Sequence, residues 1–213
     1  MSRGRWLVAL MVTSLLGACT EADSRSASRE LALSSAPAPA DAPLAVVDSS
    51  FPPAEQMRRF RATTPDSAAA YAGGARSRDA LVRGFVEALA AGDTAALVEL
   101  AMSRGEFTYL YYDASPLSRH PTRLDPAVAW FIIEQNGAKG ITRVLRRFGG
   151  RTIEYRGHDC PEPPRSLGTG GDRVWEHCTV RYVEDGVEMT GAWFGGILES
   201  RGTFKFVSYS NGF

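Results

Sequence analysis

The strongest constraint on the fold is a change in hydrophobic periodicity near Arg151. Before this residue, apolar side chains recur every three or four positions, as in ALVRGFVEALAAG (residues 80–92), which is typical of helices that bury one face. After it, stretches such as TFKFVSYS (203–210) alternate apolar and polar residues, as strands covered on one side do. Helices followed by antiparallel strands predict an α+β domain with the helices on one face of a sheet.

Capping residues mark the ends of two consecutive helices expected from residue 77 onward. Ser77 suits an N-cap, and Gly92 follows the apolar run where a C-terminal cap belongs. Asp93 then suits the N-cap of a second helix, TAALVELAM (94–102), because its side-chain oxygen can accept from the first turn. The two helices are therefore expected to follow each other almost directly.

Two further helices are expected between residues 125 and 150. Asp125-Pro126 is a strong start signal, and Asn136-Gly137 predicts that this helix ends after Ile133. KGITRVLRRFGG (139–150) predicts a fourth helix, which its paired glycines end.

Four strands are expected beyond Arg151. Asp185-Gly186 predicts a tight hairpin between the second and third strands, and SRG before Thr203 predicts another. The expected fold is an antiparallel sheet of about four strands with helices packed on it. The strands are RTIEYRGH (151–158), RVWEHCTVRYVE (173–184), VEMTGAWFGGILE (187–199) and TFKFVSYS (203–210).

The N-terminus predicts export. Two arginines precede an apolar run from Trp6 to Ala18, which is too short to cross a bilayer and fits the hydrophobic region of a signal peptide. Leu16-Gly17-Ala18-Cys19 resembles the bacterial lipobox, which implies that residues 1–18 are removed and that Cys19 is acylated. An ordinary signal peptide cut near Ala18 is the alternative. The resemblance implies a lipoprotein of the cell envelope, and Thr20 after the cysteine favours the outer membrane where the source has one.

Residues 19–75 are expected to form a disordered linker. Ser, Ala and Pro dominate this stretch, which offers too little apolar surface to offset the entropy of ordering. Within it, Met57 and Phe60 fall at helical spacing, so a short helix touching lipid headgroups or the domain is the alternative to a transient turn. The folded domain is expected over residues 76–213.

Charge excludes one class of partner. Lys plus Arg and Asp plus Glu number 24 each, so no overall field favours nucleic acid. GTGGD (168–172) lacks the lysine and following helix of a phosphate-binding loop, and no G-x-S-x-G nucleophile elbow occurs. No cofactor is expected, and the expected partners are the membrane, through the lipid anchor, and an unknown small molecule or envelope protein.

The helical region and the last hairpin together resemble a known fold family. ALVRGFVEALAAGDTAALVEL (80–100) and ESRGTFKFVSYS (199–210) are similar to the nuclear-transport-factor-two-like fold, also called SnoaL-like or cystatin-like. The resemblance covers residues 77–213 and implies a cone of curved sheet wrapped by helices. The family includes isomerases, cyclases, dehydratases and members without a known reaction, so the fold alone names no activity.

Family enzymes of the isomerase type use a carboxylate base and a tyrosine or protonated acid in the cone. No residue here can be aligned with these roles. Glu176, on the second expected strand with Val174 and Cys178, is a weak candidate acid, and a solvated carboxylate is the simpler interpretation. Five aromatic residues are candidates to line a pocket or to form the core. They are Tyr109, Tyr111, Tyr112, Tyr182 and Trp193.

Cys160 and Cys178 are expected to form a disulfide. Export places them in an oxidising compartment, and acylation of Cys19 leaves them as an even pair. A regular hairpin pairing 160 with 178 would mix polar and apolar residues on one face, unless a bulge forms near Gly157 or the bridge lies beyond the ladder. A zinc site with His158 and His177, and a free reactive thiol, are the alternatives.

These features favour an exported, membrane-anchored domain that binds a small molecule or a protein without catalysis. The alternative is an isomerase, cyclase or hydrolase that uses a carboxylate and a tyrosine in the cone. A deep pocket with a buried acid beside a tyrosine would favour the enzyme. A cone filled by Phe and Trp side chains would favour the binding module.

Overall fold

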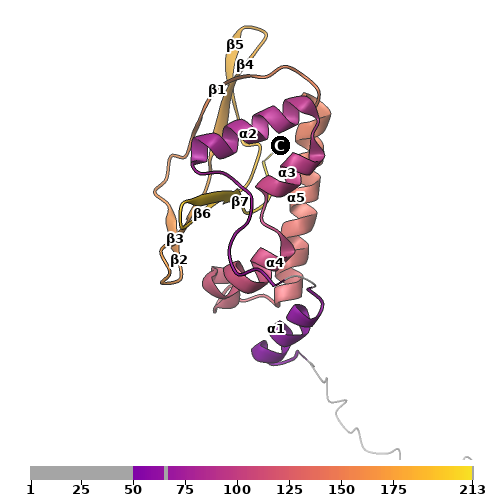
Figure 1. The fold of residues 1–213 in the computed structure, drawn as a ribbon, viewed down its shortest axis with the longest axis vertical. Helices are drawn as coiled ribbons and strands as arrows, with labels where there is room; N and C mark the ends of the chain where they lie inside the picture. Colours follow the sequence, from indigo (N-terminus) through magenta and orange to yellow (C-terminus); the bar gives the residue numbers. More distant parts are fainter. Residues whose placement is uncertain (1–49, 65–66, 213) are drawn as a thin grey trace, which may run out of the picture. The chain divides into compact units, whose positions relative to one another are not determined.

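The computed structural model describes residues 50–64 and 67–212, and it has the expected α+β class. The lipobox and Cys19 lie outside the described residues. Helices α2 and α5 and two small antiparallel sheets form the body of the described region (Figure 1). The α-helices are α1 (Pro53–Ala62), α2 (Arg78–Ala91), α3 (Thr94–Leu100), α4 (Arg104–Glu106) and α5 (Pro126–Phe148). Between α4 and α5 lie a short π-helix, η1 (Phe107–Tyr111), and two 3-10 helices, η2 (Tyr112–Ala114) and η3 (Pro116–Ser118).

The strands divide into a sheet of three, in the order β1-β4-β5, and a sheet of four, in the order β2-β3-β6-β7. This division corrects the expectation of one four-stranded sheet. The strands are β1 (Glu154–Asp159), β2 (Arg165–Leu167), β3 (Asp172–Trp175), β4 (Thr179–Glu184), β5 (Val187–Gly191), β6 (Ile197–Ser200) and β7 (Thr203–Phe206).

Two of the expected strands are each broken between the two sheets. The stretch 173–184 separates into β3 and β4, because the backbone turns at His177, which has a positive φ of 55°. The stretch 187–199 separates into β5 and β6, and residues 192–196 lie between them. Alternation of apolar and polar residues predicts a strand but not the point at which it changes sheets.

Helix caps and hairpins follow the predicted residues. The Ser77 side chain accepts a hydrogen bond from the Ala80 N–H, and Gly92 ends α2 with a left-handed backbone. The Asp93 carboxylate accepts from the Ala96 N–H at the start of α3. Asp185-Gly186 joins β4 to β5 with positive φ at both residues, which is the geometry of a two-residue hairpin turn.

The predicted helix end at Asn136-Gly137 is wrong, because α5 continues unbroken from Pro126 to Phe148. Gly137 lies buried within this helix, and the next glycine, Gly140, permits close packing. A Cβ atom on Gly140 would lie 1.7 Å from the carbonyl oxygen of Tyr209, so only glycine lets the C-terminal segment approach the helix this closely.

The structure also differs from the expected linker between residues 50 and 75. Helix α1 packs against α5, and its Met57 and Phe60 side chains are buried. Phe60 meets the ring of Phe107 edge to face, with ring centroids 6.0 Å apart. The ordered region therefore begins before residue 76, since contacts with the domain stabilise a helix that would be marginal alone. The rest of the expected linker, 19–49, lies outside the described residues.

Aromatic rings fill the interior between α2 and the sheets. Phe85 of α2 is fully buried, and its ring centroid lies 5.5 Å from those of Phe206 and Tyr209. Trp193 is equally buried, 4.4 Å from Phe148 and 4.7 Å from Tyr182. Such contacts add to the large apolar area that each ring removes from water.

A buried ion pair fastens β7 to α4. The Lys205 ammonium lies 3.0 Å from both carboxylate oxygens of Glu106, and the two side chains are 5% and 3% exposed. The carboxylate also accepts from the backbone N–H groups of Ala72 and Ser103, and Lys205 donates to the Ala72 carbonyl. With every partner present the pair is tolerated, whereas loss of one partner would leave a buried charge.

No helix in the described part of the chain is both long and apolar enough to cross a bilayer.

Candidate functional site

An apolar groove of about 500 Å³ lies between α3, α5 and the C-terminal residues 207–209. Its volume falls in the range of small-molecule sites. Most of the lining is aliphatic or aromatic. The lining residues are Thr94, Leu97, Val98, Ala101, Met102, Ser103, Arg104, Trp130, Ile133, Glu134, Gly137, Ala138, Ile141, Leu145, Val207, Ser208 and Tyr209.

The continuity of α5 creates this groove. Trp130, Ile133, Gly137 and Ile141 recur at spacings of three or four, so they share one face of the helix. Gly137 contributes no side chain in the middle of that face, and Tyr209 N lies 3.5 Å from where its Cβ atom would be. On the opposite wall, Val98 of α3 is 74% exposed, an unusual exposure for a β-branched apolar residue beside other apolar groups.

Two charged side chains, Arg104 and Glu134, contribute to the groove. The Arg104 guanidinium donates to the Thr63 hydroxyl at 2.9 Å and lies over the Phe60 ring, 4.8 Å from its centroid. Glu134 is exposed. A ligand with an apolar body and one hydrogen-bond acceptor would match such a lining, because a few polar groups in an apolar pocket fix orientation.

The tyrosine in the groove is held by the fold. Tyr209 donates its hydroxyl to the Leu97 carbonyl at 2.5 Å, and burial raises the pKa of its phenol far above the usual value. The phenol therefore stays protonated and is engaged as a donor. It is a structural support for the wall and not a general acid or base.

The five predicted pocket-lining aromatic residues lie elsewhere, and none of them lines the groove. Tyr182 and Trp193 belong to the filled interior. Tyr111 and Tyr112 belong to a second core cluster around Phe107, where Tyr112 donates to the Leu124 carbonyl at 2.6 Å. Tyr109 is half-buried, and the Arg61 guanidinium lies 5.6 Å from its ring centroid. The alternative interpretation of these residues as core therefore fits four of the five.

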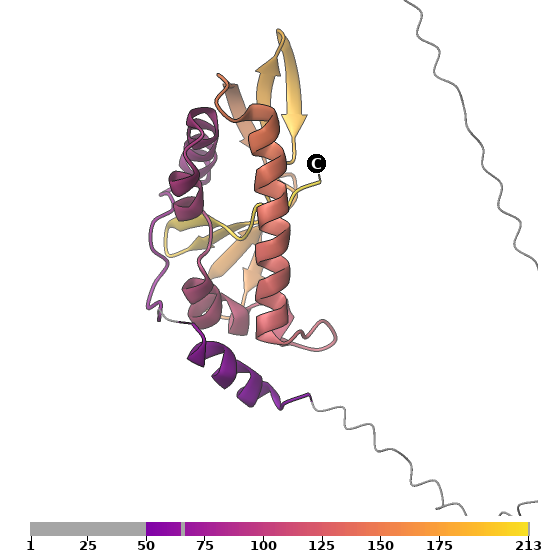
Figure 2. The ribbon, with the colours of Figure 1, turned by 90° about the vertical axis from the view of Figure 1, so that its right-hand side faces the viewer.

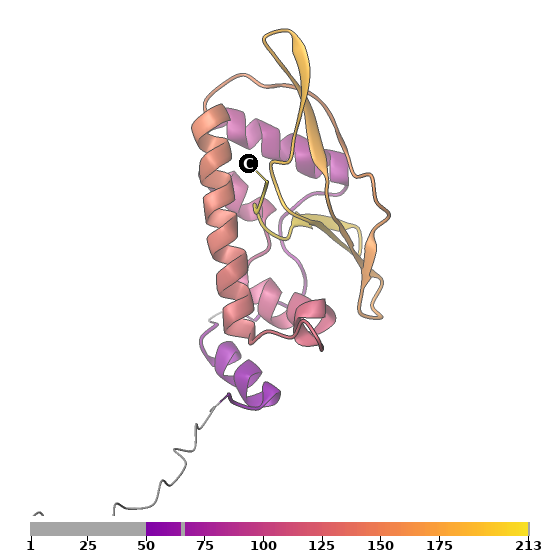
Figure 3. The ribbon, with the colours of Figure 1, turned by 180° about the vertical axis from the view of Figure 1, so that it is seen from behind.

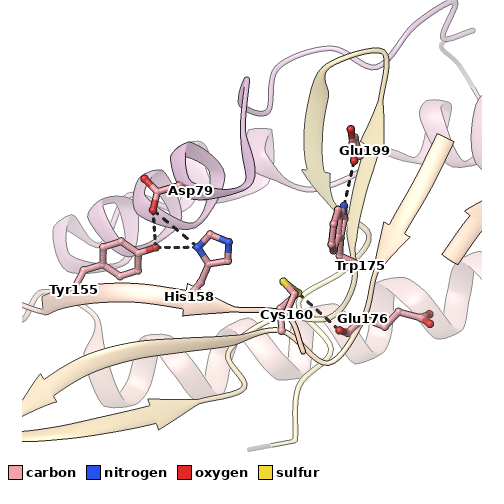
Figure 4. Close-up of a disulfide and its surroundings, with 8 residues drawn as sticks. Asp79, Tyr155, His158, Cys160, Trp175, Glu176 and Glu199 are labelled. Atoms are coloured by element: carbon pink, nitrogen blue, oxygen red, sulfur yellow. Dashed lines mark hydrogen bonds and ion pairs between the residues drawn. A yellow bond between two sulfur atoms is a disulfide. The ribbon is translucent and has the colours of Figure 1, made fainter. Parts of the chain in front are cut away.

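Glu176 lies in the turn between β3 and β4 and is not buried. Its side chain is 44% exposed and forms an ion pair with Arg165, with an N–O distance of 2.9 Å. In Figure 4 its carboxylate points away from the disulfide. The solvated interpretation of Glu176 matches this position, and no tyrosine donates to its carboxylate among the described hydrogen bonds.

Cys160 and Cys178 form the expected disulfide, with Cα atoms 4.2 Å apart. A regular hairpin would have mixed polar and apolar residues on one face. The two features expected to avoid this, a bulge near Gly157 and a bridge beyond the ladder, are both present. The register shifts between Tyr155 and Gly157, and the last ladder pair is Asp159 with Thr179, so the bridge lies just beyond the ladder. Gly157 has a φ of 142°, a conformation that glycine adopts without strain.

The histidines near the disulfide face different partners. His158 Nδ1 lies 3.3 Å from the Tyr155 hydroxyl and 4.0 Å from Asp79 Oδ1 (Figure 4). His177 is mostly exposed and lies 3.1 Å from Glu162. Because the two sulfur atoms bond each other and the imidazoles diverge, these four side chains do not assemble the zinc site considered above. Among residues 50–64 and 67–212, no group of three or more His, Cys, Asp and Glu gathers around a common point.

The cluster of Asp79, Tyr155 and His158 connects α2 to β1. The Tyr155 hydroxyl lies 3.3 Å from Asp79 Oδ1. Burial and the Asp79 carboxylate raise the pKa of Tyr155 to about 12. Burial, with a smaller effect of Arg78, lowers the pKa of His158. Tyrosine and histidine are thus both neutral near pH 7, and the arrangement stabilises the contact between helix and strand.

The sequence pattern does not indicate the residues of the groove. Trp130, Ile133 and Ile141 have helical spacing, but the predicted break at Asn136-Gly137 assigns them to two helices. A continuous helix with a small residue on its apolar face is the pattern that would have indicated a groove.

Comparisons with protein-family models, curated proteins and solved structures find no match to this chain.

Proposed function

We propose that the chain is an exported, membrane-anchored binding module whose groove between α3 and α5 holds a small apolar molecule without reacting with it. The observation that carries the proposal is the groove itself, about 500 Å³ in volume and lined mostly by carbon atoms. Transfer of an apolar ligand from water to such a lining is favourable in proportion to the area covered.

The filled interior supports binding over catalysis. The rings of Phe85, Phe148 and Trp193 pack against one another in the interior between α2 and the sheets, which supports the binding module over an enzyme with its substrate in a cone. The candidate acid, Glu176, is paired with Arg165 near the surface. We therefore do not carry the isomerase, cyclase or hydrolase alternative forward, because no described observation favours it.

The membrane anchor rests on the sequence. Leu16-Gly17-Ala18-Cys19 at the end of a short apolar run supports acylation at Cys19. The disulfide fits the same compartment, because such bonds persist in oxidising environments. We place the module in the cell envelope, at the outer membrane where one exists. Its assignment to the nuclear-transport-factor-two-like family remains a proposal from the resemblance.

Titration with the fluorescent apolar probe N-phenyl-1-naphthylamine tests the groove. Ala138 lines the groove, and Ala138→Leu would fill it while keeping a strong helix former. Ala127, exposed on the same helix outside the groove, provides the matched control Ala127→Leu. We expect Ala138→Leu to weaken probe binding by at least about tenfold, and Ala127→Leu to leave it unchanged, since a filled site excludes ligand. Equal affinities in both variants would overturn the proposal.

Membrane fractionation tests the anchor independently. Cys19→Ala should release the exported chain from washed membranes, because it removes the acylation site. Retention of Cys19→Ala in those membranes would contradict lipid anchoring and leave the groove experiment unaffected.

A further inference from the structure

The outward side of α5 carries a stripe of two parts. Val128, Phe131 and Ile132 form its apolar end, with exposed fractions of 48%, 59% and 42%. Lys139, Arg143 and Arg146 form its basic end, and all three are exposed. At 100° per residue these six positions fall within about 120° of one another, so they share one face of the helix. We call this surface the outer stripe.

The outer stripe is distinct from the groove. Ala129, Gly137, Gly140 and Val144 are buried on the opposite side of α5. The one acidic residue of the helix, Glu134, lines the groove and lies off the stripe. Figure 2 looks onto α5 along its length, with no other described element crossing in front of it. The six stripe positions are exposed, and the charged side chains among them are all basic.

We propose that the outer stripe docks the domain on an anionic phospholipid surface. Exposed Phe, Ile and Val beside Lys and Arg on one helix face match the two components of such a surface, acyl chains near the headgroups and negative phosphates. Each basic side chain near an anionic leaflet adds attraction, while the apolar end gains by leaving water. The helix lies along the interface and does not cross it.

The start of the described chain supports this orientation. Helix α1 packs against α5, and the Arg123 guanidinium donates to the Gln56 side chain of α1 at 3.1 Å. Figure 3 shows α1 beside the end of α5 that begins at Pro126, which is also the apolar end of the stripe. A tether running from Cys19 to Ser50 would thus join the domain close to the side chains proposed to enter the membrane.

A second copy of the chain fits the stripe poorly. A two-fold contact between antiparallel α5 helices would place the basic end of one stripe against the apolar end of the partner copy. The stripe has no carboxylate with which to pair those charges, so burial there would leave them uncompensated. An anionic surface provides the missing negative charge.

Vesicle co-sedimentation tests the proposal. The sample is the chain from residue 20 onward, purified with its disulfide intact. It keeps the whole compact unit from Asp48 to Phe213 and lacks the apolar leader and Cys19, so neither can contribute to binding. The probes are phosphatidylcholine vesicles with and without phosphatidylglycerol. We expect binding only to the anionic vesicles, weakened as salt rises.

Matched variants separate the stripe from overall charge and hydrophobicity. Lys139→Glu with Arg146→Glu should weaken partitioning by more than about tenfold. Arg76→Glu with Arg201→Glu, at exposed positions outside α5, makes the same charge change and should have a much smaller effect. Phe131→Ser should also weaken binding, whereas Val187→Ser in the β4–β5 hairpin, also 59% exposed, should not.

Three results would overturn the proposal. One is equal binding to both kinds of vesicle. Another is equal loss from the stripe variants and their controls. A third is a dimer in solution that Phe131→Ser dissociates, since the stripe would then be a contact between copies. None of these results bears on probe binding in the groove.

Discussion

The interior beneath α2 and the groove between α3 and α5 are neighbouring apolar regions that share Leu97 and Tyr209 in their walls, yet one is filled and the other is open. The interior receives rings from several elements, including Phe85 of α2 and Phe148 of α5. The groove receives Gly137 and Ala138 from the same α5. The same helix therefore adds a large ring to the packed interior and contributes two small residues, beside larger apolar ones, to the groove.

This difference shows that an open pocket need not lie where the fold class leads one to expect a cavity. Protein interiors pack to nearly crystalline density, so space is left only where side chains are too small to meet. A cone-like arrangement of helices and strands leads one to expect a pocket inside it. Here the rings fill the interior between α2 and the sheets, and the open apolar surface lies between α3 and α5.

The largest expected effect comes from comparing the two tryptophans in these regions. Trp193→Ala should cost about 3–5 kcal/mol of unfolding free energy, because it removes a fully buried ring from the filled interior. Trp130→Ala, in the groove wall, should cost about 1–2 kcal/mol, since its ring is only partly buried. Urea denaturation followed by circular dichroism measures both. Equal losses would show that the groove is packed as tightly as the interior.

Removal of the disulfide tests how much this bond stabilises the filled interior. Cys178 is buried in the same cluster as Val180 and Trp193. Cys160→Ser with Cys178→Ser should lower the free energy of unfolding by about 3 kcal/mol, since the bond closes a loop spanning 18 positions. Probe binding in the groove should change little, because the bridge contributes nothing to its lining. Two alkylated thiols in the unreduced exported protein, read by intact mass, would contradict the bond.

Substitutions of two glycines in α5 test how closely Tyr209 packs against this helix. Gly140→Ala should destabilise the domain by about 1–3 kcal/mol, because its Cβ atom would meet the Tyr209 carbonyl oxygen at 1.7 Å. Gly137→Ala should be neutral or stabilising by up to about 1 kcal/mol, since its Cβ would make an ordinary contact of 3.5 Å and alanine favours the helix. Thermal denaturation of the two variants side by side checks the contrast. Equal changes would mean that Tyr209 does not approach the helix as described.

These glycines also show how far the sequence leads. Local chemistry predicted the caps at Ser77 and Asp93 and the hairpin at Asp185-Gly186, because each signal acts within a few residues. The long-range causes were hidden. Gly140 is required by the backbone of Tyr209, far along the chain, and nothing in the residues around Gly140 indicates that contact. The Lys205–Glu106 pair was missed for the same reason.

The candidate site was predictable only in part. Cysteine number and export predicted the disulfide, and the mixed face it implied led to the bulge near Gly157. The groove depends on a continuous α5 and on the return of Tyr209 to it, and neither follows from periodicity. The division of strands between two sheets likewise depends on a turn at His177 that alternation does not reveal.

The smallest expected effect is a pH dependence at the edge of the filled region, where His158 and Tyr155 hold α2 to β1. Burial lowers the pKa of His158, so below about pH 6.5, the ordinary histidine value, the unfolded chain binds more protons than the folded chain. Stability should therefore fall as pH drops from 7 through the pKa of folded His158, by less than about 1 kcal/mol because His158 is only partly buried. His158→Gln should flatten this slope, as measured by urea denaturation at several pH values. His120→Gln, which removes an exposed histidine, is the control. If both variants keep the wild-type slope, the neutral imidazole of His158 does not contribute to the contact between helix and strand.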